Sequence, residues 1–204
     1  MRKESELRSF CIDLSSSEPS PGGGTAAAAA GSMAASLVVM VCGITAKNKK
    51  HASNKPELDS IGESMSALRD ELVGLASEDA RAYDKVVEAA RELKAKGLGE
   101  PADVYERALK NAAEVPLRTV EACVKVLEAS VRVSEIGLRS ARSDVGVAAL
   151  LAKAGLKGAY MNVVINLEGV SDGDFARLKR ERLNELLTQG DRLSKRVLKK
   201  INLG

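Results

Sequence analysis

Hydrophobic residues recur at three- and four-residue intervals along most of the chain, and this spacing predicts amphipathic helices. The longest apolar seam begins after Pro56, a residue suited to the first turn of a helix. It contains Leu58, Ile61, Met65, Leu68, Leu72 and Leu75. A second seam follows Pro116, where a proline inside a helix predicts a kink. It contains Leu117, Val120, Val124, Leu127, Val131 and Ser134. These seams predict long helices packed side by side.

Helix-breaking segments divide the rest of the chain. SSSEPSPGGG ends a first helix over about 2–12, GLGEP at 97–101 separates the two long helices, and EGVSDGD precedes a last one. Ser143 is expected to cap the N-terminus of a helix over 144–167. The last helix is predicted to bury Phe175, Leu178, Leu186, Leu193 and Val197. The sequence therefore predicts an all-α, single-domain bundle of about six helices, with long central helices, over residues 1–204.

One predicted helix differs from the others because it carries no charge between Glu18 and Lys47. Its sequence, PSPGGGTAAAAAGSMAASLVVMVCG, is long enough to span a membrane, but residues 22–36 are mostly small and weakly apolar. Acidic residues precede it, which excludes a signal peptide. We expect no membrane span and a helix buried on all sides, ending near Ala46. Small residues every fourth position, Ala27, Gly31 and Ala35, would let another helix approach closely.

Composition narrows the class of protein. The chain is 45% hydrophobic and 29% charged, with no tryptophan and few aromatic residues, which favours helices in an ordinary soluble domain. Its three cysteines are isolated and it has a single histidine, which argues for a reducing cytoplasm and against a zinc site or a disulfide framework. The net charge of +3 comes from interspersed signs, so we expect no nucleic-acid partner.

Asp79 interrupts the longest apolar seam. Continuing the spacing beyond Leu75 places this carboxylate at an inward-facing position, where a lone buried charge is costly. One interpretation is a structural ion pair, or exposure through the drift of the helical register. The other is an acid/base group.

A stripe of small residues runs through the segment 142–167. Ala148, Ala152, Gly155 and Ala159 lead to two carboxamides one turn apart, Asn162 and Asn166. These amides either cap backbone at the helix end or bind a ligand. At the start of the segment, Asp144 suits the positive end of the helix dipole, and Arg142 places a cation beside it.

Cations gather in TAKNKKHAS at 45–53. Lys47, Lys49, Lys50 and His51 lie at the end of the uncharged helix, where they would complement its dipole or bind an anionic ligand. Gly23 and Lys49 are separated by about 39 Å if the chain between them is helical. One small ligand can use both ends only if antiparallel subunits supply one each, which predicts a dimer.

Several blocks in the same order resemble the cyclodeaminase/cyclohydrolase family. They are PSPGGGTAAAAAGSMAASLVVMV, EDARAYDKVVEA at 78–89, AAEVPLRTVEAC at 112–123 and RSDVGVAALLAKAGLKGAYMNVVINLEGVSD. The resemblance implies an all-helical homodimer with folate bound between subunits, and no metal or cofactor beyond the tetrahydrofolate substrate. It places Gly22, Gly23, Gly24, Asp79, Asp144, Asn162 and Asn166 on recurring motif positions. Two stretches depart from the family pattern. Relatives commonly carry Asn at the position of Leu138. After the first long helix they carry glycine and then lysines before an aromatic residue, where this chain has Asn48 and His51.

The resemblance implies cyclodeamination of 5-formiminotetrahydrofolate to 5,10-methenyltetrahydrofolate, with release of ammonia. The alternatives are methenyltetrahydrofolate cyclohydrolase activity and a non-catalytic folate-binding module. For the enzyme we expect Asp79 and Asp144 to share acid/base and cation-stabilising roles, with Arg142 or Lys49 tuning one carboxylate. We expect Asn162 and Asn166 to orient the pterin, and the N–H groups of Gly22 to Gly24, with Lys49 and Lys50, to bind substrate oxygens.

Overall fold

The computed structural model describes residues 2–96 and 100–201, together with their side chains except those of residues 2–4, 100 and 101. Its α-helices are α1 (Arg2–Leu14), α2 (Gly23–Ala46), α3 (Lys55–Lys96), α4 (Glu100–Ile136), α5 (Arg142–Glu168) and α6 (Gly173–Ile201). Two short 3₁₀ helices lie between them: η1 (Lys49–Asn54) joins α2 to α3, and η2 (Arg139–Ala141) joins α4 to α5. Within these ranges no residue forms a strand, so the all-α prediction is confirmed. Part of the predicted break at 97–101 lies outside the described residues.

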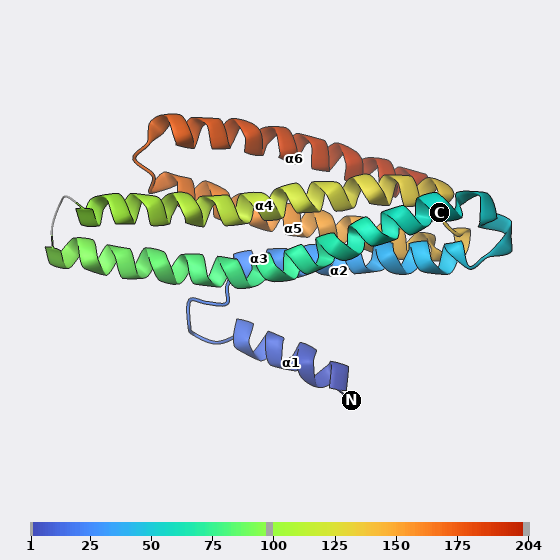
Figure 1. Ribbon diagram of the computed structural model, residues 1–204, viewed down its shortest axis with the longest axis horizontal. Helices are drawn as coiled ribbons and strands as arrows, with labels where there is room; N and C mark the ends of the chain where they lie inside the picture. Colours follow the sequence, from blue (N-terminus) through green and yellow to red (C-terminus); the bar gives the residue numbers. More distant parts are fainter. Residues whose placement is uncertain (1, 97–99, 202–204) are drawn as a thin grey trace.

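Five helices form the bundle, and α1 projects from it (Figure 1). α2 packs between α3 and α5, while α4 packs against α3, α5 and α6. α3 and α4 are the longest helices, and α3 extends well past the start of α2 (Figure 1). The N-terminus of α2 therefore lies beside the middle of α3, and this places Asp79 next to the start of α2.

Small residues set the distance between α2 and α5. A Cβ atom added to Gly155 would lie 2.7 Å from the carbonyl oxygen of Ala27 and 3.2 Å from the backbone nitrogen of Gly31. One added to Gly31 would lie 2.9 Å from Sγ of Cys123 on α4. Because real Cβ atoms essentially never approach so closely, the predicted close approach of small-residue stripes is confirmed.

The prediction that α2 is buried on all sides is wrong. Met33, Met40 and Ile44 are 48%, 41% and 41% exposed, although Ala28, Ala34 and Val38 are fully buried. The reason is that α3, α4 and α5 cover only part of the helix. α5 exposes an apolar stripe as well, and we call the two stripes together the α2–α5 face. Its large exposed side chains are Met33, Met40, Ile44, Val147, Leu150, Met161 and Ile165.

By length and hydropathy alone, two segments could cross a membrane, Gly23–Ala46 and Arg139–Glu168. In the most apolar stretch of each segment, 44% and 39% of the residues, respectively, are buried inside the bundle. Helices in the core of soluble proteins share this combination of length and hydropathy, so the two segments alone are weak support for a membrane span.

Two smaller sequence predictions are also wrong. Ser143 does not cap α5, because η2 leads directly into the helix and Ala141 occupies the N-cap position without a side-chain hydrogen bond. Leu178 is 55% exposed, since the buried seam of α6 runs instead through Ala176, Leu183, Leu186 and the residues that follow. Leu193 and Val197 are buried as predicted, and Phe175 is half-buried.

Candidate functional site at the start of helix α2

Asp79 of α3 caps α2 from outside that helix. Gly22 occupies the N-cap position of α2 and has no side chain to accept a hydrogen bond from the first turn. The backbone N–H of Thr25 donates to the Asp79 carboxylate instead. The Thr25 hydroxyl lies 3.5 Å from Oδ2 of Asp79 and 3.2 Å from the carbonyl oxygen of Ala76. A carboxylate from a neighbouring helix thus satisfies a donor that every helix start leaves free.

Gly24 provides the space for this carboxylate. A Cβ atom at position 24 would lie 2.5 Å from Cγ of Asp79 and would overlap both carboxylate oxygens. The side chain of Asp79 therefore occupies the volume that any other residue at position 24 would fill. The glycine in PSPGGGT is required for close approach, and its partner is a residue 55 positions away.

Burial and hydrogen bonding act on Asp79 in opposite directions. Burial raises the pKa of its carboxyl group above the ordinary value of 3.8, and the Thr25 hydrogen bonds partly offset this rise. Among the described residues no cation forms an ion pair with Asp79; its neighbour Glu78 instead pairs with Arg118 of α4 at 2.7 Å. The structure thus holds Asp79 inward without a salt bridge, and a carboxyl group with a raised pKa is suited to proton transfer.

A cavity of about 300 Å³ lies beside this carboxylate. Its walls come from the loop before α2, the first turn of α2, and parts of α3, α4 and α5. It brings together six of the residues predicted from the sequence: Gly22, Gly23, Gly24, Asp79, Asn162 and Asn166. Tyr83 and Ile165 also line it and are 42% and 67% exposed. Sequence reasoning missed both, although Tyr83 lies one helical turn after Asp79.

The two asparagines use their amide groups on backbone. Nδ2 of Asn162 donates to the carbonyl oxygen of Gly158 at 2.9 Å, and Nδ2 of Asn166 donates to that of Ala112 at 2.6 Å. These bonds match the backbone-binding interpretation of the pair. They also fix both side chains at the wall of the cavity, where the amide oxygens remain available as acceptors.

The other predicted residues lie at the opposite end of the bundle. Asp144 and Arg142 begin α5, about 27 Å along the helix from Asn162. Lys49 and Lys50 are exposed in η1, beyond the C-terminus of α2. Within one chain the structure therefore separates the predicted set into a carboxylate-bearing end and a basic end.

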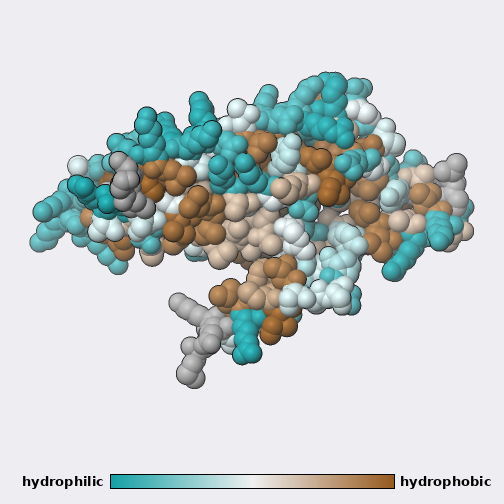
Figure 2. Space-filling model, turned by 180° about the vertical axis from the view of Figure 1, so that it is seen from behind, coloured by the Kyte–Doolittle hydropathy of each residue, from teal (hydrophilic) through white to brown (hydrophobic). Residues whose placement is uncertain are grey.

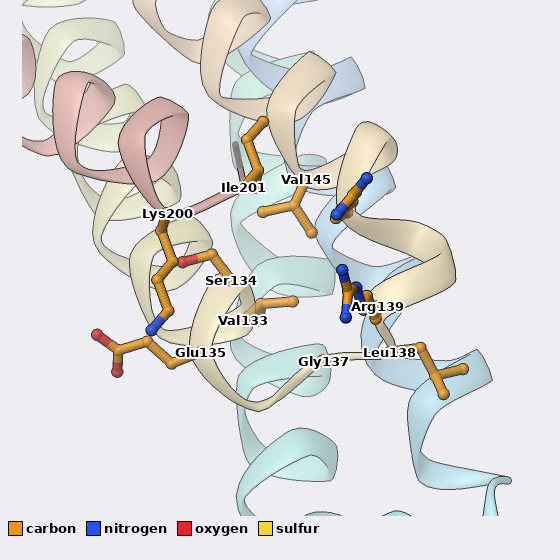
Figure 3. A pocket seen from close by; sticks show the side chains of 10 residues that line it. Val133, Ser134, Glu135, Gly137, Leu138, Arg139, Val145, Lys200 and Ile201 are labelled. Atoms are coloured by element: carbon orange, nitrogen blue, oxygen red, sulfur yellow. The ribbon is translucent and has the colours of Figure 1, made fainter. Parts of the chain in front are cut away.

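The basic end has its own cavity, of about 410 Å³, between the C-termini of α4 and α6 and the start of α5. Arg142 lines it, and Figure 3 shows Lys200 and Glu135 at one side and Arg139 at the other. η1 is attached to this end by His51, whose Nδ1 lies 3.1 Å from the carbonyl oxygen of Ile136 and must carry a proton to bond it. This contact attaches η1 to the C-terminal end of α4.

No group of three or more histidine, cysteine, aspartate or glutamate side chains in the described part of the chain is arranged to hold a metal ion. The chemistry available at the Asp79 cavity is that of a carboxyl group, amide oxygens, backbone N–H groups at a helix start and a flat aromatic side chain. These groups can transfer protons and bind a planar, polar ring system.

Comparisons with known proteins agree with the resemblance seen in the sequence. The family model for formiminotransferase-cyclodeaminase matches residues 6–185. Methenyltetrahydrofolate cyclohydrolase from Methylorubrum extorquens is 35% identical over 94% of this chain and 93% of its own length. Formimidoyltransferase-cyclodeaminase from Sus scrofa is 29% identical over 96% of this chain, which spans only 36% of that relative.

A solved structure, formiminotetrahydrofolate cyclodeaminase from Thermotoga maritima, has the same fold. It superposes with a TM-score of 0.87 at 32% identity, over 96% of this chain and 94% of its own. The chain therefore belongs to the formiminotransferase-cyclodeaminase family of folate one-carbon enzymes, as a cyclodeaminase or a cyclohydrolase.

Proposed function

We propose that this protein closes the methenyl bridge of tetrahydrofolate by cyclodeamination of 5-formiminotetrahydrofolate. The observation that carries the proposal is the half-buried Asp79 carboxyl group, held at the start of α2 beside a cavity. The full-length match to a solved structure of a formiminotetrahydrofolate cyclodeaminase supports this choice of reaction. We further propose that the protein works in the cytoplasm and needs no metal or redox cofactor.

The reaction needs two proton transfers. N10 of the folate attacks the formimino carbon on N5, forms a new C–N bond and loses its proton. The carbon–nitrogen bond to the former imine nitrogen then breaks, and that nitrogen leaves as ammonia, carrying its own hydrogen, the N10 proton and one proton from solvent. We assign the N10-to-nitrogen transfer to Asp79, because a carboxyl group with a raised pKa can both accept and return a proton.

The cavity suits the fused-ring end of the substrate. Its volume of about 300 Å³ lies at the lower limit for ligand pockets, so the rest of the folate would extend outside. Tyr83 and Ile165 offer flat and apolar walls to the ring, and the amide oxygens of Asn162 and Asn166 can accept its N–H groups. The first N–H groups of α2 can donate to a ring carbonyl.

We propose that the active protein is an antiparallel homodimer joined through the α2–α5 face. This face begins at the Asp79 cavity, since Ile165 belongs to both, and ends near the basic end, where Ile44 and Val147 lie. A two-fold axis through it would bring the cavity of one subunit to the basic end of the other. Asp144 of the partner subunit would then face the product cation, with Lys49 and Lys50 of the partner subunit near the substrate's carboxylates.

A second reaction has its own support. The relative that is 35% identical over nearly its whole length is named a methenyltetrahydrofolate cyclohydrolase. In that reaction water attacks the methenyl carbon, and Asp79 would take a proton from the water. The bond from that carbon to N5 then breaks as the remaining hydroxyl becomes the formyl carbonyl. One water proton ends on N5 and the other is released to solvent, which leaves 10-formyltetrahydrofolate. The same proton-transfer group and the same ring site serve both reactions.

Absorbance of the methenyl product tests the proposal. Purified protein is mixed with 5-formiminotetrahydrofolate and, separately, with 5,10-methenyltetrahydrofolate. Methenyl absorbance that appears in the first mixture together with ammonia supports cyclodeamination. Loss of absorbance faster than the blank in the second mixture alone supports the cyclohydrolase. Folate binding without turnover in either mixture would contradict an enzymatic function.

A further inference from the structure

Helix α1 carries an apolar side formed by Leu7, Phe10, Cys11 and Leu14. Leu7 is 61% exposed, Cys11 is exposed and the other two are half-buried, and no other helix packs extensively against α1 in the described part of the chain. An isolated helix of 13 residues is only marginally stable in water, so α1 needs a surface to pack on. Figure 1 shows it projecting from the bundle, joined to α2 by the loop 15–22.

The α2–α5 face and the apolar side chains of α1 are seen together in the view of Figure 2. Figure 2 shows apolar side chains across the bundle on this side, with the apolar side chains of α1 beyond their lower edge. If a second copy packed on the α2–α5 face, the edge of that copy would therefore lie next to α1. From these positions we propose that α1 packs on the partner subunit as an exchanged arm, an inference that rests on the dimer of the proposed function.

The size of the surfaces favours a second copy as the occupant. Two adjacent helices with the length of α2 present a face about 36 Å by 20 Å, or about 700 Å². A standard interface buries about 800 Å² per partner. A helix of 13 residues, about 20 Å long and 10 Å wide, supplies the remaining area. The face alone lies slightly below this standard area, and the face with α1 reaches it.

Sedimentation as a function of dilution tests the arm. The double variant Leu7→Ser with Phe10→Ser should raise the dimer dissociation constant at least tenfold. A matched double variant on exposed polar positions of α1, Arg8→Ser with Asp13→Ser, should change it less than twofold. An unchanged dissociation constant in the apolar variant, with the wild type dimeric, overturns the arm and leaves the dimer standing. A wild type that is monomeric at every concentration overturns both.

Amide hydrogen exchange shows which chain α1 packs on. Met33→Glu with Leu150→Glu places two charges on the exposed α2–α5 face and should give a folded monomer. If α1 packs on the partner, the amides of residues 2–14 should exchange faster in this monomer than in the wild-type dimer. Equal protection in the two proteins would mean that α1 packs on its own chain, and the proposal would be wrong.

Discussion

Replacing Gly24 by alanine should disable Asp79 without unfolding the protein. The added Cβ atom would lie 2.5 Å from Cγ of Asp79, whereas ordinary contact begins near 3.4 Å. The carboxyl group must therefore move by about 1 Å. A displacement of this size in a reacting group can cost about a hundredfold in rate, which corresponds to about 2.7 kcal/mol of transition-state stabilisation.

The free energy of unfolding should fall by about 2 kcal/mol at most in the same variant, too little to unfold it. Alanine within a helix stabilises a protein by up to about 1 kcal/mol relative to glycine, and the overlap with Asp79 opposes this gain by about 1–3 kcal/mol. Gly74→Ala is the matched control, because a Cβ atom there meets no atom within 4 Å. It should keep full activity. The assay is kcat/KM from methenyl absorbance together with thermal unfolding. A folded Gly24→Ala protein with wild-type kcat/KM would refute the assignment of Asp79.

Other substitutions test the same account from different sides. Asp79→Asn should lower kcat by about 10²- to 10⁴-fold, while Glu78→Gln, which removes only an exposed ion pair with Arg118, should retain activity; equal losses would point to a structural effect on α3. Because the pKa of Asp79 is raised above 3.8, the acid limb of kcat/KM should lie above pH 3.8 and disappear in the residual activity of Asp79→Asn. The folded protein binds this proton more tightly than the unfolded chain. The free energy of unfolding from this group should therefore fall as pH rises from 3.8 through the folded pKa, and denaturant titrations of Asp79→Asn should not show that fall. Gly155→Ala should destabilise the bundle by about 1–3 kcal/mol, since its Cβ atom would lie 2.7 Å from the carbonyl oxygen of Ala27; an unchanged melting temperature would contradict the close contact of α2 and α5.

The sequence predicted the helices well because apolar spacing and helix-breaking residues act locally. α2 ends at Ala46 and Asp79 lies on the inward side of α3, as expected. Asp79 stood out because a charge in an apolar seam is visible without any knowledge of its neighbours. The small-residue stripes also predicted a close helix contact, which Gly31 and Gly155 confirm.

What the sequence could not give depends on contacts between distant segments. The Asp79 carboxylate occupies the space that a side chain at Gly24 would need, and Thr25 donates to this carboxylate from another helix. Neither contact can be recognised from the spacing of residues along the chain. The exposed stripe of α2 is apolar like its buried side, so periodicity could not separate them. Ser143 had the right side chain for a cap, but the turn before it already starts the helix at Arg142.

A heterodimer made from two inactive variants tests the shared site most directly. Asp79→Asn and Asp144→Asn chains are co-expressed with different tags, and the mixed dimer is purified. If each site takes Asp79 from one subunit and Asp144 from the other, one of its two sites carries both carboxylates, and it should recover about half of the wild-type activity. Activity no higher than that of either variant alone would contradict a site shared between subunits.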